Sequence, residues 1–167
     1  YGLTKILYEE KFKYKEYNFI IVDTPGLRRR NKVIEENEKS RNAQVLKLMD
    51  KVDVIILLID SKENLTKQDF RLADLSINRN KMLFFIFNKF DTIENKKEFK
   101  RNIKKFLTNS YSKYKMVNID FISAKYNKKI SNVLNNIIKK DNLLSVQIQK
   151  TKLNKFLKDL DKKSSYP

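Results

Sequence analysis

The chain has 167 residues and a net charge of +17, with 37 Lys and Arg against 20 Asp and Glu and 41% hydrophobic residues. This length accommodates one domain with a short appendage, and the apolar content is sufficient for a packed core. The absence of Cys and His excludes disulfide frameworks, thiolate metal sites and catalysis by a cysteine nucleophile or a histidine base. The apolar runs are far shorter than the roughly 20 residues that span a bilayer, and no leader-like segment opens the sequence. We therefore expect a cytoplasmic protein with no membrane partner.

The basic excess has two interpretations, and the sequence leaves both open. A pI of about 9.9 suggests a nucleic-acid partner. However, nearly all of the excess is lysine, asparagine is abundant, and the chain has two Gly, two Pro and no Trp. Such a composition is typical of AT-rich coding sequences, which would raise the charge without any partner.

The first 60 residues predict a hairpin followed by a helix and a buried strand. Apolar residues alternate with charged ones from Ile6 to Tyr14 and a mostly apolar run follows, so residues 5–23 should form two adjacent strands. Apolar residues then recur at helical spacing over 43–49. The β-branched run at 52–59 is typical of a parallel strand that is buried on both faces.

The rest of the chain continues the alternation of helices and strands. Thr66 is a good N-cap residue for the next helix. The elements expected after it are strands at 82–87 and 117–122 and helices with apolar stripes at 99–107 and 130–138. This order predicts a three-layer α/β/α fold with a mainly parallel sheet, whose ligand site lies at the carboxyl ends of the strands.

Polar motifs follow three of the predicted strands, at the edge where such a fold binds its ligand. They are Asp23-Thr24-Pro25-Gly26, Asn88-Lys89-Phe90-Asp91 and Ser123-Ala124-Lys125. In this order and spacing they resemble the third, fourth and fifth signature motifs of the translation-factor class of P-loop GTPases. Each motif alone is weak, but their combination at three strand ends is specific. The resemblance implies a P-loop GTPase fold that binds GTP or GDP together with magnesium.

The resemblance implies that Asp91 reads the base. Guanine presents its N1–H and its exocyclic amine side by side, and one carboxylate can accept both hydrogen bonds. By the same resemblance, Asn88 would tie neighbouring loops and contact the base, and the stem of Lys89 would lie along the base plane. The backbone N–H of Ala124 would donate to the guanine carbonyl, with Ser123 and Lys125 completing that motif.

The resemblance also assigns a phosphate end. Asp23 would bind magnesium through water, and Gly26 would place its N–H against the γ-phosphate, where a Cβ would block the approach. Thr24 and Pro25 lie between these two residues and belong to the same nucleotide-binding motif. Thr4 would be the switch threonine that binds magnesium through its hydroxyl, so Thr4 and Gly26 are the candidate catalytic residues and Thr4 and Asp23 the candidate metal ligands.

The residue after Gly26 departs from Ras-like enzymes. Leu27 stands where those enzymes carry the glutamine that orients the attacking water. A leucine cannot orient water, so hydrolysis would be slow or would depend on backbone groups, a monovalent cation such as potassium, or a partner. The basic segment 28–33 is either a solvated loop or a switch segment that contacts RNA phosphates.

Further stretches narrow the resemblance to one family. The basic run after Leu27, Glu38-Lys39-Ser40 and the segment 66–71 are similar to the second GTPase domain of the Der/EngA family of bacterial ribosome-assembly GTPases. This implies a GTP-hydrolysing switch in large-subunit assembly, with ribosomal RNA or the large ribosomal subunit as partner. We expect a GTPase domain over 1–142, and over 143–167 the beginning of the family's KH-like domain, with a strand at 146–148 and a helix at 151–157.

One departure from the family is serious. A Walker loop, GxxxxGK[ST], needs two glycines, and the two glycines of this chain, Gly2 and Gly26, stand elsewhere. The family's first strand, which lies between the hairpin and the strand at 52–59, and its phosphate loop would then lie upstream. The chain is therefore predicted to be a fragment that alone binds nucleotide poorly and is inactive. Alternatives left open are an RNA-binding module, a degenerate pseudo-GTPase without hydrolysis, and an Era-like or tRNA-modifying GTPase.

Overall fold

The computed structural model describes residues 8–23, 45–110, 112–115, 117–145 and 149–163. The chain divides into two compact units, 1–134 and 135–167, and each is described by itself. Several predictions lie outside the described residues and are not tested by the structure. They concern the strand at 146–148 and the candidate site residues Thr4, Thr24, Pro25 and Gly26.

The predicted hairpin is present at the start of the chain. Strand β1 (Tyr8–Tyr14) pairs antiparallel with β2 (Tyr17–Asp23) across a two-residue turn. The cross-strand partners Phe12 and Phe19 stack with their ring centroids 5.2 Å apart, which stabilises the pairing. The hairpin ends at Asp23, so this candidate site residue lies at the carboxyl end of β2.

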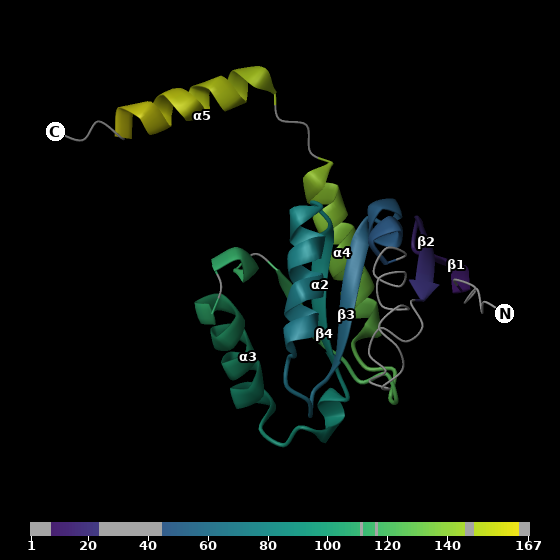
Figure 1. Cartoon of the computed structure of the whole chain (residues 1–167). Coiled ribbons are helices and arrows are strands. Elements are labelled where there is room, and N and C mark those ends of the chain that lie inside the picture. Colours follow the sequence, from purple (N-terminus) through teal and green to yellow (C-terminus); the bar gives the residue numbers. More distant parts are fainter. Residues whose placement is uncertain (1–7, 24–44, 111, 116, 146–148, 164–167) are drawn as a thin grey trace, which may run out of the picture. The chain divides into compact units, whose positions relative to one another are not determined.

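A three-stranded parallel sheet forms the centre of the first unit. Strands β3 (Val54–Asp60), β4 (Met82–Asn88) and β5 (Asn118–Phe121) lie in that order. Helix α2 (Lys67–Asn78) connects β3 to β4, and α3 (Lys96–Ser110) lies between β4 and β5 in the sequence (Figure 1). This alternation confirms the predicted α/β class and brings the carboxyl ends of the three strands to one edge of the sheet.

Helix α2 begins at the predicted cap. Thr66 accepts a hydrogen bond from the Asp69 N–H at 3.3 Å, and the Asp69 carboxylate accepts one from the Thr66 N–H at 2.9 Å. This reciprocal capping box satisfies two backbone donors that the first turn would otherwise leave unpaired. It fixes the point at which the chain turns from β3 into the helix.

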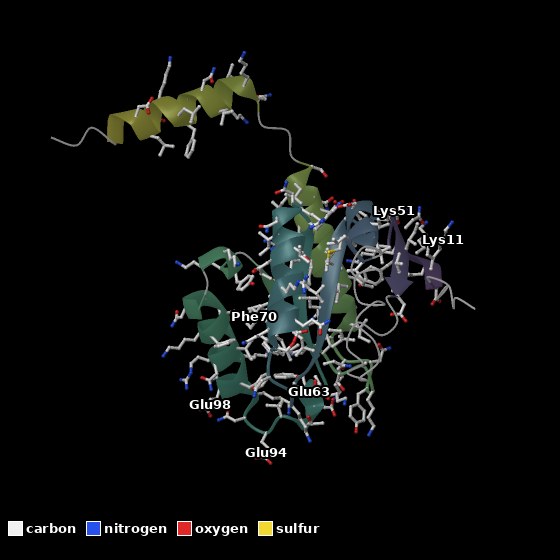
Figure 2. All side chains as sticks on the ribbon, in the orientation of Figure 1. Lys11, Lys51, Glu63, Phe70, Glu94 and Glu98 are labelled. Carbon is white, nitrogen blue, oxygen red and sulfur yellow. The ribbon has the colours of Figure 1, made fainter. Side chains whose placement is uncertain are left out.

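The core lies between the sheet and helices α2 and α3. Its buried members are Leu57, Ile59, Ala73, Leu83, Phe85, Phe87, Leu107 and Tyr114. Phe70 of α2 points toward α3 (Figure 2), and its ring centroid lies 6.1 Å from that of Phe106 and 5.8 Å from that of Tyr114. On the opposite face of β4, Phe84 and Ile86 are also buried. Strand β4 is therefore covered on both faces, as a three-layer fold requires.

Strand β3 differs from β4 in the exposure of that second face. Ile56 is 47% exposed and Leu58 is 49% exposed, although their pairing partners Phe84 and Ile86 are buried. Among the described residues, β3 is an edge strand and the β1–β2 hairpin pairs with no strand of the parallel sheet.

The remaining helices are α4 (Ile130–Leu144) and α5 (Lys150–Lys163). Helix α5 contains the helix that was expected at 151–157, and it carries an exposed apolar stripe at helical spacing. The members of the stripe are Leu153, Phe156, Leu157 and Leu160. Of the helices that the structure describes, none is long and apolar enough to cross a membrane.

The burial of Phe85 gives a test of this core. Phe85 is fully buried and its ring lies edge-on to Tyr114, so Phe85→Ala should lower the free energy of unfolding by about 3–5 kcal/mol. Phe106→Ala is the matched control, because that ring is 47% exposed and its removal should cost about 1 kcal/mol. Urea denaturation of both variants measures the difference, and equal losses would contradict the described core.

Candidate functional site

Three loops meet at the carboxyl edge of the parallel sheet. Asp60 at the end of β3 lies opposite Asn88 at the end of β4, and Phe87 lies opposite Phe121 at the end of β5. The loops that follow these strands are 61–66, 89–95 and 122–129. Two of the sequence motifs are therefore neighbours in space, although they lie more than 30 residues apart in the chain.

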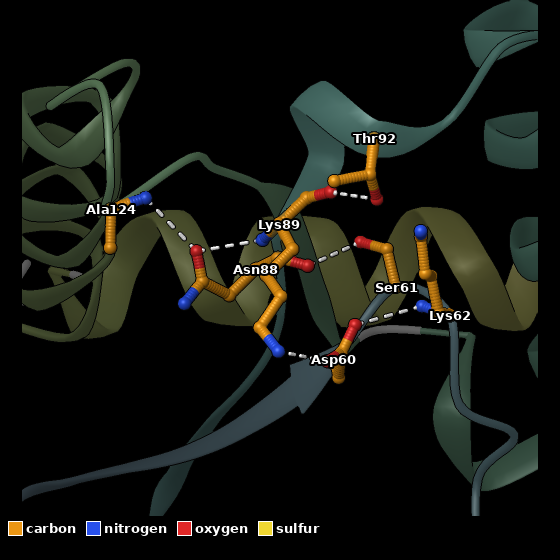
Figure 3. Close-up of polar contacts among 7 residues, drawn as sticks. All are labelled: Asp60, Ser61, Lys62, Asn88, Lys89, Thr92 and Ala124. Atoms are coloured by element: carbon orange, nitrogen blue, oxygen red, sulfur yellow. Dashed lines mark hydrogen bonds and ion pairs between the residues drawn. The ribbon is translucent and has the colours of Figure 1, made fainter.

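Asn88 connects all three loops (Figure 3). Its side-chain Oδ1 accepts hydrogen bonds from the backbone N–H of Ala124 at 2.9 Å and of Lys89 at 2.7 Å. Its backbone carbonyl accepts two more from Ser61, one from the N–H at 2.8 Å and one from the hydroxyl at 2.6 Å. Because a single residue satisfies four donors, the relative position of the loops is determined by Asn88.

The turn after Asn88 buries one side chain in the core and leaves its two neighbours accessible to solvent. Lys89 has φ 58° and ψ 29°, a left-handed conformation that reverses the chain before the short 3-10 helix Phe90–Thr92. The Lys89 carbonyl accepts hydrogen bonds from the Thr92 N–H at 3.0 Å and the Thr92 hydroxyl at 2.8 Å. Phe90 is buried against Phe121 with centroids 5.0 Å apart, while Lys89 is exposed and Asp91 half-buried.

Asp91 is paired with the loop that follows β5. The hydroxyl of the buried Ser123 donates a hydrogen bond to Asp91 Oδ1. This bond lowers the pKa of Asp91 against a smaller opposing effect of desolvation, and the positive charges of Lys125 and Lys96 lower it further. Asp91 is therefore ionised at neutral pH and acts only as a hydrogen-bond acceptor.

The loop after β5 is closed by its own backbone. Ser123 and Lys128 form an antiparallel bridge, with the Ser123 N–H donating at 3.2 Å and the Lys128 N–H at 3.0 Å. Ala124 and Lys125 lie within this closed loop and are exposed. The Lys125 ammonium lies 5.2 Å from the centroid of the exposed Tyr126 ring. The bridge holds the Ala124 N–H toward Asn88.

Two further residues of the site were missed by sequence reasoning. The Lys89 ammonium forms an ion pair with Asp60, with Nζ and Oδ2 2.6 Å apart, and Ser61 binds the Asn88 carbonyl as described above. The sequence contained a signal for both residues, because Asp60 and Ser61 are polar and directly follow a predicted buried strand, as the recognised motifs do. They were overlooked because no signature motif covers that strand end.

The structure thus brings together six of the residues predicted from the sequence, which are Asn88, Lys89, Asp91, Ser123, Ala124 and Lys125. Asp23 is exposed at the end of β2 in the hairpin. In the part of the chain that the structure describes, no three Asp or Glu side chains gather as a metal site. The other phosphate-end candidates lie outside that part.

Comparison with known proteins agrees with this geometry. Residues 1–89, more than half of the chain, match the model of the 50S ribosome-binding GTPase family. The chain belongs to this family. It is 31% identical over 153 residues to GTPase Der of Finegoldia magna, covering 92% of this chain and 35% of that protein. It is 33% identical over 136 residues to GTPase Der of Fusobacterium nucleatum, covering 80% and 30%. The predicted resemblance to the Der family is confirmed, and the chain spans about a third of these relatives.

Solved structures show the same fold. The chain superposes with a TM-score of 0.66 on Era in complex with MgGDPNP and a segment of 16S ribosomal RNA, at 21% identity over 83% of this chain and 45% of that one. It superposes with a TM-score of 0.63 on translation elongation factor SelB from Methanococcus maripaludis with a GTP analogue, at 21% identity over 86% and 29%. The predicted P-loop GTPase fold is therefore confirmed.

The Ser123–Asp91 contact gives a pH-dependent prediction. Ser123→Ala removes the first cause of the lowered pKa, so the pKa of Asp91 should rise toward its ordinary value. A lowered folded-state pKa stabilises the fold above the unfolded pKa, and this stabilisation is lost as the pH falls through the folded value. The variant should thus be less stable than wild type at neutral pH, with a difference that shrinks in acid.

An NMR titration of the Asp91 carboxyl carbon and unfolding at several pH values measure both effects. Ser76→Ala is the control, because its hydroxyl donates to the Leu72 carbonyl within α2. An unchanged Asp91 pKa in Ser123→Ala would show that the hydroxyl does not determine the ionisation of Asp91.

Proposed function

We propose that the chain carries the guanine-reading part of a GTP-hydrolysing switch that acts in assembly of the large ribosomal subunit. The observation that carries the proposal is the grouping of an ionised Asp91, the Lys89 stem and the Asn88–Ala124 contact at one sheet edge. Membership of the 50S ribosome-binding GTPase family supports the same function.

Asp91 is the group that we assign to base recognition. Its carboxylate would accept both the N1–H and the exocyclic amine of guanine, a donor pair that adenine lacks. Ser123 occupies one of its acceptor positions, which fixes the carboxylate while leaving lone pairs for the base. GTP and GDP carry the same guanine base and so present the same two donors to Asp91. Asp91 would therefore confer base specificity and would not distinguish GTP from GDP.

The Ala124 N–H would donate to the guanine carbonyl. In the structure this N–H donates to Asn88 Oδ1 at 2.9 Å. Binding of guanine would therefore require the N–H to be shared between the two oxygens, or to turn from Asn88 toward the base. Asn88 would then keep the loop in place through its other contacts, which involve Lys89 and Ser61.

The phosphate end would complete the switch. Asp23 and Thr4 would hold magnesium, which neutralises charge on the phosphates, and Gly26 would contact the γ-phosphate. Because no Walker loop fits the glycines of this chain, we assign the phosphate loop to residues outside the 167. With Leu27 unable to orient water, hydrolysis would depend on backbone groups, a monovalent cation such as potassium, or a partner.

The base assignment is tested with nucleosides, which carry no phosphate and therefore need no phosphate loop. Asp91→Asn keeps one oxygen that can accept the N1–H and replaces the other with an amide NH₂. This NH₂ faces the exocyclic amine of guanine donor to donor, but it can donate to the carbonyl that xanthine carries at the same position. The ratio of guanosine to xanthosine affinity should fall by about 100-fold. NMR titration of the 167-residue chain measures both affinities.

The matched control for this change is Asp53→Asn, an exposed residue that precedes the amino end of β3. It should leave the ratio of the two affinities unchanged. An unaltered ratio in Asp91→Asn itself would remove Asp91 from base recognition.

Ribosomal RNA is the partner that we propose on the basis of the net charge of +17 and the family membership. Contacts to RNA phosphates release counterions, so affinity for a large-subunit RNA should fall by about 100-fold or more between 50 and 200 mM salt. Gel-shift measurements with that RNA and with a shuffled RNA of equal length separate recognition from simple charge attraction. Equal affinity for both RNAs would leave the net charge of +17 as a consequence of composition.

A further inference from the structure

The ion pair between Asp60 and Lys89 lies at the rim of the proposed base site. It forms because β3 and β4 pair in register, so that Asp60 lies beside Asn88 and next to the residue that follows it. Lys89 Nζ lies 2.6 Å from Asp60 Oδ2 (Figure 3). The Lys89 side chain is 60% exposed and the Asp60 side chain 20% exposed, so a ligand can reach the lysine while its anchor is largely covered.

Asp60 is also held in place by hydrogen bonds that do not involve Lys89. Its other carboxylate oxygen, Oδ1, accepts the backbone N–H of Lys62 at 3.0 Å, and its carbonyl accepts the N–H of Glu63 at 2.9 Å. The hydrogen bond from Lys89 is the first cause of a lowered Asp60 pKa, and Asp60 in turn raises the pKa of Lys89. Both groups are therefore charged at neutral pH.

The backbone of Lys89 is fixed at the other end of the same side chain. Lys89 adopts its left-handed conformation between Asn88, which accepts its N–H, and Thr92, which donates to its carbonyl. A lysine side chain with its backbone and its ammonium both bound has lost most of its rotational freedom. Its methylene stem then forms a preset apolar surface between the two ends.

From this geometry we propose that Asp60 is a positioning residue for guanine recognition, which acts by holding the Lys89 ammonium so that the stem is ready to stack on the base. The proposal rests on the proposed function, in which the Lys89 stem lies along the base plane. An ion pair whose ammonium is 60% exposed is screened by solvent and contributes little to stability, so the consequence of the contact is expected in binding and not in folding.

The test measures guanosine binding to the 167-residue chain through the NMR shifts of the Lys89 and Ala124 amides. Asp60→Asn keeps the shape of the side chain and the oxygen that accepts the Lys62 N–H, and it removes the charge. The dissociation constant should rise by about three- to tenfold, because the variant must order the lysine side chain upon binding. The melting temperature should change little.

The matched control is Asp50→Asn. It removes an ion pair of the same kind, Asp50 with Arg79 at 3.1 Å, before the amino end of β3 and away from the three loops. It should leave guanosine affinity unchanged. Equal affinities of Asp50→Asn and Asp60→Asn would overturn the proposal.

Three readouts separate positioning through Lys89 from a general loosening of the loops. Lys89→Met keeps an apolar stem without the ammonium, and adding Asp60→Asn to it should weaken binding no further. Guanosine is neutral, so rising salt should weaken wild-type binding toward the Asp60→Asn value and leave the variant unaffected. The ratio of guanosine to inosine affinity should stay constant in Asp60→Asn, because stacking on a stem does not read the exocyclic amine.

The outcomes distinguish this inference from the function on which it rests. Additive losses in the double variant, or a changed guanosine to inosine ratio in Asp60→Asn, would show that Asp60 supports the loops as a whole and would overturn the proposal. If guanosine near its solubility limit causes no NMR shift of the Ala124 and Lys89 amides in the wild-type chain, the proposed base site is wrong and this inference is wrong with it.

Discussion

The parallel register of β3, β4 and β5 is the constraint on which the whole site depends. It sets Asp60 beside Asn88 and Phe87 beside Phe121, so that three loops start from one edge. Asn88 then joins the loops through its side chain and its carbonyl. A slip of one residue would turn every side chain to the opposite face of the sheet and would part these acceptors from their donors. The aromatic side chains buried on both faces of β4 hold the register, so the proposed base site would depend on core packing.

Asp91 and Asp60, at the carboxyl edge of the parallel sheet, are kept ionised by different partners. This difference suits one carboxylate to binding a ligand and the other to positioning a side chain. Asp91 is held by a neutral hydroxyl, that of Ser123, which orients the carboxylate and leaves its charge unneutralised for a ligand. Asp60 is held by the Lys89 ammonium, so its charge is already compensated. The first arrangement favours direct recognition of donors on a base, whereas the second favours control of where a side chain lies. The end of β3 and the turn after β4 would thus combine support and recognition.

Much of the fold and part of the site could be predicted because their signals are local. Alternating and continuous apolar runs indicated the hairpin and the strands, and Thr66 indicated the start of α2, since caps and periodicity depend on neighbours in the sequence. The motifs proposed to read the base were recognised by their resemblance to GTPase signature motifs and by their place after strands. Asp60 was not, because its role comes from pairing with a residue 29 positions away, which no spacing rule encodes. Sequence reasoning also did not predict that Asn88 Oδ1 accepts the Ala124 N–H, the donor that was assigned to the guanine carbonyl, because these two residues are 36 positions apart.

The proposed function divides between the parallel sheet and the β1–β2 hairpin, and this division has an energetic consequence. The proposed base-reading residues lie at the end of β4 and in the loops after β4 and β5, next to the core of the parallel sheet. The phosphate-end residue Asp23 lies instead on a hairpin that pairs only with itself there, while Ile56 and Leu58 of β3 remain about half exposed. A strand and helix beside β3 would bury apolar surface and would, in this fold, also bring the phosphate loop. Sheet stability and phosphate affinity would therefore be gained together, whereas the proposed base specificity would depend on residues that the structure already describes.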